Sequence, residues 1–310
     1  MGKIRLALIA GGVSGEREVS LNGAKGVEKA LDPEKYAVVR YDPATDLARI
    51  AADAPDIDVA FILLHGMHGE DGTMQGFLEL LGIPYQGAGV LGSALAMDKN
   101  LAKTMYKLHG LPVANWEMAS RDDIADPGRL LATVRLPLVI KPVRQGSSIG
   151  MSVVREADGL SAALELAFAH DREVMVEEFI SGREITVGVI GNDELDALPL
   201  VEIIPDEKYE FFDYEAKYMP GATREVCPAE VSEEIRTKAQ AYGVTAHRAL
   251  QLRGYSRTDM IVSGSDIYIL ETNTIPGMTP TSLLPQAAAK FGLSFPALLD
   301  RLIELAMERP

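Results

Sequence analysis

Two carboxylates and an amide near the end of the chain are spaced so that they could hold a divalent cation. Asp259 lies in one apolar stretch, and Glu271 and Asn273 follow the next one. Residues two apart on a strand point to the same face, so Glu271 and Asn273 share one. A three-residue loop within the turn Ser263–Asp266 would place Asp259 directly opposite Glu271. Converging carboxylates are costly unless a cation lies between them, and an all-oxygen set suits Mg²⁺ that also binds a phosphate.

Two basic segments add candidate anion sites. Arg257 precedes Asp259 by two residues and would share its face, where it could hold an anion beside the metal. Residues 141–150 (KPVRQGSSIG) form a glycine- and serine-rich turn whose N–H groups and hydroxyls could hold a phosphate next to Lys141. It is not a Walker A loop, because the lysine precedes the glycines and no helix follows. It resembles the phosphate-covering hairpin of kinase-like sites, with a plain surface hairpin as the alternative.

Further polar groups follow predicted strands or begin a helix. Residues Glu177–Ile180 end a strand, where the backbone could bind an adenine edge while Phe179 and Ile180 cover its face. Glu184 could accept a hydrogen bond from a ribose hydroxyl. Lys99 begins a helix, a position that the helix dipole disfavours for a lysine unless an anion lies nearby. Taken alone, each of these groups also fits a solvated surface.

Two other segments indicate a pocket and a lid. His65 and His68 lack the rest of a zinc set, so a polar pocket in which Glu70 pairs with His65 is the favoured interpretation. Residues 207–221 form a polar, aromatic stretch that is long for a loop in a compact domain. We expect this stretch to be a lid that adds charge and excludes water when it closes.

The composition excludes several classes of protein. A length of 310 residues predicts two or three domains, and a formal net charge of −15 argues against binding to nucleic acid or anionic membranes. No segment approaches the ~20 apolar residues of a membrane span. The apolar run within Met1–Gly11 is too short for a signal peptide. The single cysteine, Cys227, excludes an internal disulfide framework and fits a reducing cytosol, so we expect a cytoplasmic protein.

The first 97 residues alternate predicted strands and helices. The predicted strands are Ile4–Ala10, Tyr36–Tyr41, Val59–Leu64 and a short last one at Ile83–Gln86, with helices at Glu16–Leu31 and Gly76–Leu81. This alternation predicts a parallel sheet covered by helices, with ligands at the carboxyl ends of its strands. Glycines at 11, 12 and 15 do not match the dinucleotide fingerprint, which argues against an NAD enzyme.

The rest of the chain is richer in strands. A helix is predicted at Met97–His109, followed by strands at Leu138–Lys141, Met151–Val154, Val174–Phe179, Glu184–Ile190 and Leu198–Ile204. Later helices are predicted at Ala157–His170, Glu230–Leu250, Ser282–Phe291 and Phe295–Ala306. The pattern predicts an α/β domain at 1–97, then α+β regions at 98–182 and 183–310. The last of these would contain the lid loop 205–221 and the metal site.

Six stretches, in order, resemble the D-alanine–D-alanine ligases of the ATP-grasp superfamily. They are GGVSGEREVSL (11–21), HGMHGEDGT (65–73), ALAMDKN (94–100), IKPVRQGSSIGMS (140–152), FFDYEAKY (211–218), and ETNTIPGMT (271–279) followed by SLLP (282–285). The resemblance implies a Rossmann-like N-terminal parallel-sheet domain followed by a two-subdomain ATP-grasp fold. It also implies an enzyme that joins two D-alanine molecules with ATP through a D-alanyl phosphate, releasing ADP and phosphate, for peptidoglycan precursors.

By position, the resemblance assigns residues to the first substrate and to ATP. Glu16 would bind the ammonium of the first D-alanine, with His65 and Glu70 supporting that pocket. Ser147 would contact Glu16 and Tyr218 and so help to hold the lid closed. The nucleotide would be bound on its phosphate side by Lys99, Lys141 and Lys217, and on its adenine and ribose side by Glu177, Glu178, Phe179, Ile180 and Glu184.

The resemblance also assigns the remaining catalytic groups. Arg257 and the Gly277 backbone would stabilise the tetrahedral intermediate as an oxyanion hole. Two ions of Mg²⁺ or Mn²⁺ would be held by Asp259, Glu271 and Asn273. Ser282 and Leu283 would receive the carboxylate of the second substrate. The residue that accepts the proton of the second amine stays unassigned.

Alternative functions lie inside and outside this family. The nearest alternative is a ligase that makes D-alanyl-D-serine or D-alanyl-D-lactate. The resemblance implies that Tyr218 favours a dipeptide product over the depsipeptide that D-lactate would give. A nucleotide-responsive binding protein without catalysis would not need all three metal ligands together with Arg257. Family resemblance implies a homodimer.

Overall fold

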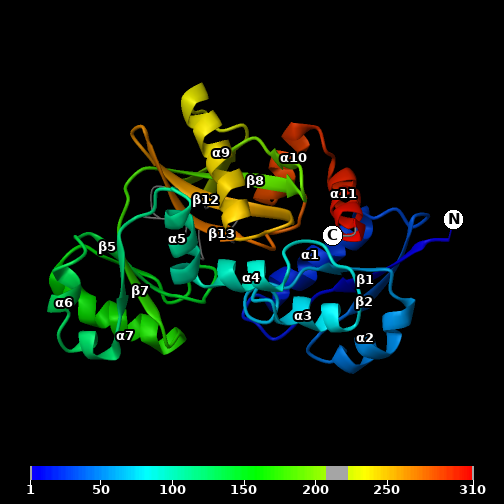
Figure 1. Cartoon of the computed structure of the whole chain (residues 1–310), viewed down its shortest axis with the longest axis horizontal. Helices are drawn as coiled ribbons and strands as arrows, with labels where there is room; N and C mark the ends of the chain where they lie inside the picture. Colours follow the sequence, from blue (N-terminus) through cyan, green and yellow to red (C-terminus); the bar gives the residue numbers. More distant parts are fainter. Residues whose placement is uncertain (1, 207–222, 309–310) are drawn as a thin grey trace.

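The computed structural model describes residues 2–206 and 223–308, and within them three sheets follow one another along the chain (Figure 1). The first is parallel, with the order β2-β1-β3, and consists of β1 (Ile4–Ile9), β2 (Tyr36–Tyr41) and β3 (Val59–Ile62). Its helices are α1 (Arg17–Ala30), α2 (Leu47–Asp53), α3 (Thr73–Leu80) and α4 (Val90–Met97). The predicted parallel sheet is therefore confirmed, with all four residues of β3 buried as expected for a covered strand.

The predicted fourth strand of this sheet is reduced to a single bridge. Ala60 pairs with Tyr85 in parallel, and beyond that point the side chain of Gln86 continues the ladder. The Gln86 amide donates to the Ile62 carbonyl at 2.7 Å and accepts from the Ile62 N–H at 2.8 Å. A buried side chain thus satisfies backbone groups that another strand would otherwise pair.

The second sheet is antiparallel, with the order β4-β7-β5-β6. It consists of β4 (Trp116–Ala119), β5 (Leu138–Pro142), β6 (Ser152–Val154) and β7 (Val174–Glu178). The helices of this region are α5 (Lys99–Leu108), α6 (Gly128–Leu131) and α7 (Leu160–His170), with short 3₁₀ turns at Arg121–Ile124 and Ala157–Gly159. Asp98 caps α5, because its carboxylate accepts from the N–H groups of Asn100 and Leu101. The helix predicted at Met97–His109 therefore begins at Lys99, and α4, which was not predicted, ends just before it.

The third sheet carries the hairpin near the C-terminal end. Its order is β11-β10-β8-β12-β13, with β9 paired to β8; the strands are β8 (Arg183–Gly191), β9 (Leu195–Ala197), β10 (Val201–Pro205), β11 (Thr223–Val226), β12 (Gly254–Ser263) and β13 (Asp266–Asn273). The remaining helices are α9 (Glu233–Ala249), α10 (Leu283–Phe291) and α11 (Phe295–Met307).

The C-terminal helices return to the first sheet. Leu284 of α10 and Leu298 of α11 share a buried cluster with Leu6 and Leu8 of β1. In Figure 1, α11 accordingly lies beside α1 and β1, close to the N-terminus. This packing places the start of α10 beside the first sheet. Among the helices of the described residues, none is both long and apolar enough for a membrane span.

Candidate functional site

One face of the six-stranded sheet carries the predicted metal ligands together with Arg257 and Glu184. The register pairs Arg257 with Gly188 and Asn273, and Asp259 with Thr186 and Glu271. Because side chains alternate along a strand, these pairings place the charged groups of three neighbouring strands on one face. The side chains on it are Glu184 of β8, Arg257 and Asp259 of β12, and Glu271 and Asn273 of β13.

The predicted pairing of Asp259 with Glu271 is confirmed, although the loop that produces it differs. Ser263 pairs with Asp266, so the turn has two residues rather than the three that we expected. A bulge between Asp259 and Met260, which leaves Leu270 without a ladder partner, then restores the predicted register. A three-residue loop and a two-residue turn with a bulge both place the two carboxylates opposite each other.

The oxygen ligands fit a divalent cation by chemistry, and basic side chains balance them in this structure. Arg257 makes a bidentate contact with Asp259, with Nε to Oδ1 at 2.8 Å and Nη2 to Oδ2 at 2.7 Å. Asn273 Nδ2 donates to Asp259 Oδ2 at 3.0 Å, and Lys99 Nζ lies 3.7 Å from Glu271 Oε2. We expected carboxylates without basic partners, so this is a correction: a cation would join a site that already holds two basic groups.

Within residues 2–206 and 223–308, no group of three or more His, Cys, Asp or Glu side chains is placed to hold a metal ion. The candidate metal site therefore depends on two carboxylates together with the Asn273 amide oxygen. Burial alone would lower the pKa of Arg257, but the adjacent Asp259 carboxylate outweighs it and raises that pKa. Arg257 therefore remains a permanent cation beside the candidate metal ligands.

Two lysines share one buried carboxylate, that of Glu177 on a central strand of the second sheet. Lys103 Nζ lies 2.8 Å from Glu177 Oε2, and Lys141 makes a close contact with Glu177 Oε1. Burial would raise the pKa of Glu177, but the two lysines outweigh it and lower the pKa to about 2. One carboxylate with two ammonium groups leaves a net positive charge in a buried place, which an anion such as a phosphate would offset.

Lys103 was not assigned to the site from the sequence, although its spacing from Lys99 could have indicated it. It lies one turn after Lys99 on α5, so the two share a helix face. It is also close to Trp116 of β4, with Nζ 5.6 Å from the ring centre. Its side chain is 1% exposed, and such burial is rare for a lysine without a partner.

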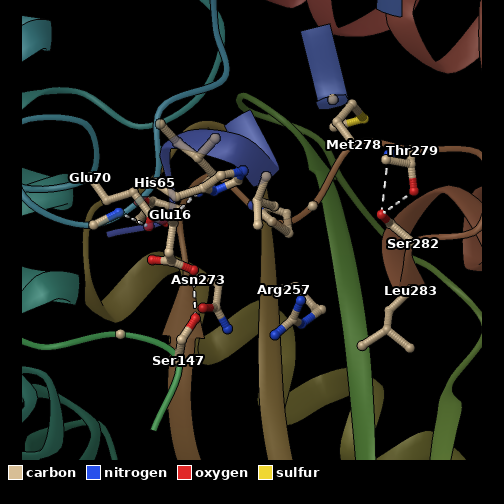
Figure 2. Close-up of a pocket in the computed structure, with 18 of the residues that line it drawn as sticks. Glu16, His65, Glu70, Ser147, Arg257, Asn273, Met278, Thr279, Ser282 and Leu283 are labelled. Carbon is tan, nitrogen blue, oxygen red and sulfur yellow. Dashed lines mark hydrogen bonds between the residues drawn. The ribbon is translucent and has the colours of Figure 1, made fainter. Parts of the chain in front are cut away.

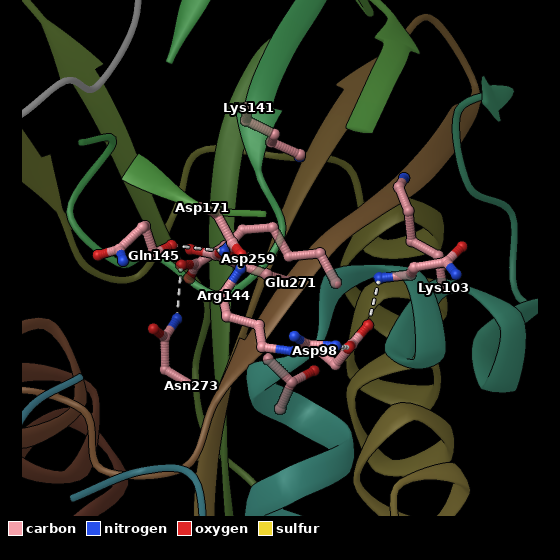
Figure 3. Close-up of polar contacts among 12 residues, drawn as sticks. Asp98, Lys103, Lys141, Arg144, Gln145, Asp171, Asp259, Glu271 and Asn273 are labelled. Atoms are coloured by element: carbon pink, nitrogen blue, oxygen red, sulfur yellow. Dashed lines mark hydrogen bonds and ion pairs between the residues drawn. The ribbon is translucent and has the colours of Figure 1, made fainter. Parts of the chain in front are cut away.

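The glycine- and serine-rich turn is fastened at its base to the start of α5 (Figure 3). Arg144 donates to Asp98 from Nε at 3.0 Å and Nη2 at 2.8 Å, and its backbone N–H donates to Asp171 at 2.8 Å. Lys99 Nζ donates to the Gln145 carbonyl at 2.7 Å. Asp98 therefore both caps α5 and anchors the glycine- and serine-rich turn. The sequence pattern did not indicate this double role.

The tip of the same turn reaches the first sheet, as predicted. Ser147 Oγ donates to Glu16 Oε1 at 2.5 Å, and Glu16 stands immediately before α1 (Figure 2). Ser147 and Ser148 both adopt positive φ angles, of 51° and 57°, which are uncommon for residues other than glycine. The contact selects Ser147 over Ser148 as the residue that joins the turn to α1.

His65 and Glu70 lie behind Glu16, but no direct bond between them organises the pocket. Glu70 instead accepts from the backbone N–H groups of Gly66 at 2.9 Å and Ile275 at 3.1 Å, and so ties the first sheet to the segment after β13. Burial raises the pKa of Glu70 to about 7, and burial lowers the pKa of His65. The expected His65–Glu70 pair is replaced by two backbone contacts.

Gly277 and Ser282 meet at the start of α10. A Cβ atom on Gly277 would lie 3.0 Å from Ser282 Oγ. Ser282 is the N-cap residue of α10, yet its hydroxyl makes no cap bond and instead contacts the Thr279 N–H at 3.1 Å. The first turn of α10 therefore presents N–H groups without a side-chain cap, which suits a carboxylate at its positive end.

The predicted adenine side has a different internal arrangement from the one that we expected. The N–H of Glu178 donates to the Asn115 carbonyl and that of Phe179 to the Pro137 carbonyl, both at 2.9 Å. The Glu178 carboxylate accepts from Asn115 Nδ2 at 3.1 Å. Two of the four residues assigned to adenine thus use their N–H groups within the protein, so recognition of an adenine edge would fall to Ile180 and to backbone carbonyls.

A cavity of about 870 Å³ joins these parts. In Figure 2, Arg257 lies between the Glu16 group and the start of α10. Of the predicted residues, those lining the cavity are Glu16, His65, Glu70, Lys99, Ser147, Arg257, Glu271, Asn273, Gly277, Ser282 and Leu283. The others that the structure describes lie deeper or to the side: Asp259, Lys141, Glu177, Glu178, Phe179, Ile180 and Glu184. Lys217 and Tyr218, with most of the predicted lid, lie outside the described residues.

Comparison with protein families identifies the chain. The family described as D-ala D-ala ligase C-terminus matches residues 105–304, and D-ala D-ala ligase N-terminus matches residues 40–88. The chain belongs to the D-alanine–D-alanine ligase family. It is 61% identical over 306 residues to the D-alanine–D-alanine ligase of Syntrophobacter fumaroxidans, covering 99% of this chain and 98% of the relative. The corresponding enzyme of Desulfotalea psychrophila is 59% identical over 99% of this chain and 96% of its own.

Solved structures agree with this assignment. The D-alanine–D-alanine ligase from Bacillus anthracis complexed with ATP superposes with a TM-score of 0.86 at 34% identity, covering 98% of this chain and 97% of that one. The VanG D-Ala:D-Ser ligase from Enterococcus faecalis superposes with a TM-score of 0.85 at 35% identity, covering 98% and 99%. The chain is thus an ATP-dependent ligase with the ATP-grasp fold, as predicted. The fold is shared by ligases named for different second substrates.

Proposed function

We propose that the chain joins two D-alanine molecules into D-alanyl-D-alanine, with hydrolysis of ATP to ADP and phosphate. The observation that carries the proposal is the shared sheet face, where Arg257, Glu271 and Asn273 enter one cavity with Glu16 and Ser282. Candidate groups for binding phosphate, ammonium and carboxylate thus surround one space. The relatives named D-alanine–D-alanine ligase at up to 61% identity support D-alanine as both substrates.

The reaction would take place in two steps. A carboxylate oxygen of the first D-alanine attacks the γ-phosphorus of ATP, so that a C–O–P linkage forms and ADP leaves. The amine of the second D-alanine then attacks the carbonyl carbon of the D-alanyl phosphate, and phosphate leaves with the former carboxylate oxygen. The amine loses a proton as the peptide bond forms. Because water would hydrolyse the acyl phosphate, closure over the site is required.

The phosphate end of ATP would meet the positive charge concentrated around α5. Lys99, Lys103 and Lys141 supply three ammonium groups there, and the turn fastened by Arg144 supplies backbone N–H groups. Bound Mg²⁺ or Mn²⁺ would neutralise phosphate charge, and we propose two ions held by Asp259, Glu271 and the Asn273 oxygen. Lys217 is proposed, from its position in the sequence alone, to add a further cation.

The two amino acids would bind at opposite ends of the cavity. Glu16, held by Ser147, would receive the first ammonium, with Glu70 and His65 fixing the segment behind it. Ser282 and the Leu283 N–H at the start of α10 would receive the second carboxylate. Arg257 and the Gly277 N–H would stabilise the tetrahedral oxyanion, and positioning with electrostatics would supply most of the rate.

We further propose that the enzyme acts in the cytosol, as a homodimer, in the synthesis of peptidoglycan precursors. The single cysteine fits a reducing compartment. Tyr218 is proposed to close the lid and to favour an amine as second substrate over D-lactate.

The test is an acceptor panel with the purified full chain, ATP and Mg²⁺. D-alanine alone should give phosphate together with a dipeptide of matching mass, whereas L-alanine alone should give neither. Phosphate release that requires D-alanine mixed with D-serine or D-lactate would move the function to one of those ligases. No release with any partner would remove the proposed reaction.

A further inference from the structure

Three buried hydroxyl groups form a chain behind the candidate metal site. Tyr106 Oη of α5 donates to Thr272 Oγ1 of β13 at 2.8 Å, and Thr272 Oγ1 lies 3.0 Å from Thr258 Oγ1 of β12. Tyr106 and Thr258 are 0% exposed and Thr272 is 4% exposed. Thr272 lines the cavity, but none of the three residues has a role in the proposed reaction, so the function described above leaves this polar chain unexplained.

The two threonines occupy the reverse side of the metal-ligand positions. Thr258 lies between Arg257 and Asp259 in β12, and Thr272 lies between Glu271 and Asn273 in β13. Because side chains alternate, the threonines point to the face opposite to the ligands. Their hydroxyl bond therefore joins the same two rungs of the ladder that carry the ligands on the other side.

The three hydroxyl groups also lie next to the β-bulge of the hairpin. Thr258 pairs with Thr272 one rung away from the bulge, where Asp259 pairs with Glu271 and Met260 already pairs with Ile269. If the two-residue turn continued without the bulge, Asp259 would face Leu270, and Glu271 would lose its place opposite Asp259. A cross-strand bond at this rung favours the bulged register.

Tyr106 connects the hairpin to α5, the helix that carries Lys99 and Lys103. Lys99, Lys103 and Tyr106 are spaced four and three residues apart and lie on one face of α5. Lys103 attaches that face to Glu177 of the second sheet, while Tyr106 attaches it to Thr272 of the third (Figure 3 shows Lys103 with the hairpin residues). The distance between the lysines and the metal ligands is thus defined by a helix bonded to both sheets.

We propose that the Tyr106–Thr272–Thr258 hydroxyl chain is a register lock, which holds Asp259 opposite Glu271 and fixes this hairpin relative to α5. Its members are positioning residues, since the threonine side chains point away from the ligand face of the sheet and act through the metal ligands. The effect on metal affinity rests on the proposed function, whereas the effect on hairpin register does not. Removing the central hydroxyl should weaken both.

The test compares near-isosteric variants of the full chain. Thr272→Val removes the central hydroxyl, Thr272→Ser keeps a hydroxyl, and Tyr106→Phe is the milder end-of-chain change. Ser256→Ala is the matched control: Ser256 is fully buried on β12, on the same sheet face as Thr258, and it bonds His247 of α9 at 2.8 Å rather than α5. Each change removes one buried hydroxyl group, with two hydrogen bonds lost in Thr272→Val and one in Ser256→Ala. Tyr106→Phe also loses a single bond, so its expected loss of stability is the one that matches the control.

Two readouts separate a lock from general destabilisation. The first is half-saturating Mn²⁺ in the presence of ADP, followed through the paramagnetic resonance signal of free Mn²⁺. The second is amide hydrogen exchange in residues 257–273. For Thr272→Val, which loses two hydrogen bonds, we expect Mn²⁺ binding to weaken by about tenfold or more, together with faster exchange in the hairpin. Tyr106→Phe should shift both readouts in the same direction by less, and Thr272→Ser should restore both values.

Two variants, Ser256→Ala and Glu271→Gln, decide whether the register lock and the metal site are correct. If Ser256→Ala changes Mn²⁺ binding and hairpin exchange as much as Thr272→Val does, the proposed register lock is wrong. The three hydroxyl groups are then ordinary contacts of the core. If wild type binds Mn²⁺ no better than Glu271→Gln, the metal site of the proposed function fails. The lock is then decided by exchange alone: faster exchange in Thr272→Val but not in Ser256→Ala supports it, and equal exchange overturns it.

Discussion

The Ser147 hydroxyl donates a 2.5 Å hydrogen bond to the Glu16 carboxylate, and so joins a turn beside the second sheet to the start of α1 in the first. The base of that turn is already fastened to α5 through Arg144 and Asp98. The turn therefore spans the space between the proposed phosphate and ammonium sites. Its two ends are fixed by different elements, which makes the Ser147 end separately testable.

Ser147→Ala should lower kcat/KM for D-alanine by about tenfold or more, because a hydrogen bond to a charged group contributes roughly 1.5 kcal/mol or more. Ser148→Ala is the control, since both residues have positive φ angles and alanine would add similar backbone strain at either. Steady-state phosphate release measures both variants. Equal losses in the two would remove the specific role of the Ser147–Glu16 contact.

Glu177→Gln should raise the KM for ATP and lower the free energy of unfolding by roughly 3 kcal/mol or more, because it leaves Lys103 and Lys141 buried without a counter-charge. Glu165→Gln changes an exposed carboxylate of α7 by the same chemistry and should do neither. Denaturant unfolding with and without ATP, and initial-rate kinetics, give the two quantities. Equal behaviour of the two variants would show that the buried charge cluster is not important for binding ATP.

The hairpin was the part of the site most accessible to sequence reasoning. Strand alternation and a recognisable turn were enough to place Glu271 opposite Asp259, because that result is the same for a three-residue loop and for a two-residue turn with a bulge. The bulge itself depends on tertiary contacts near Thr258 and Thr272, which the local sequence does not encode. The overall fold class was predicted for a related reason: long periodic segments such as α9 and β8 carry strong local signals.

The parts that were not predicted depend on long-range partners. Lys103 had helical spacing from Lys99, but its burial follows from Glu177, which is distant in sequence. Gln86 was expected to end a strand, whereas its side chain completes the ladder of Ile62. Short elements such as β4 and α4 were missed because few residues define their periodicity.

The pH dependence of stability should carry the signature of Glu70. Its pKa is raised by burial from 4.5 to about 7, so between these values the unfolded chain loses the proton before the folded one does. Relative to Glu70→Gln, the wild-type free energy of unfolding should therefore fall as pH rises from 4.5 to 7 and stay level above that. Denaturant unfolding across this range measures the difference, with the exposed Glu165→Gln as the control for a lost surface charge. A flat difference would contradict the proposed protonation of Glu70.

Gly277→Ala should weaken binding of the second D-alanine. The new Cβ would lie 3.0 Å from Ser282 Oγ and displace that hydroxyl by a few tenths of an ångström from its position. We expect KM for the second D-alanine to rise roughly three- to tenfold, while the KM for ATP stays unchanged. Gly26→Ala is the matched control, because a Cβ there would meet nothing within 4 Å. An unchanged second KM in Gly277→Ala would remove the assignment of Ser282 to that substrate.

The most direct test of carboxylate activation follows one oxygen atom. D-Alanine labelled with ¹⁸O in its carboxylate is supplied with ATP and Mg²⁺, and the released phosphate is analysed by mass spectrometry. Attack of the carboxylate on the γ-phosphorus predicts one ¹⁸O atom transferred to phosphate for each dipeptide formed. Phosphate without ¹⁸O alongside dipeptide would contradict the D-alanyl phosphate and, with it, the proposed mechanism.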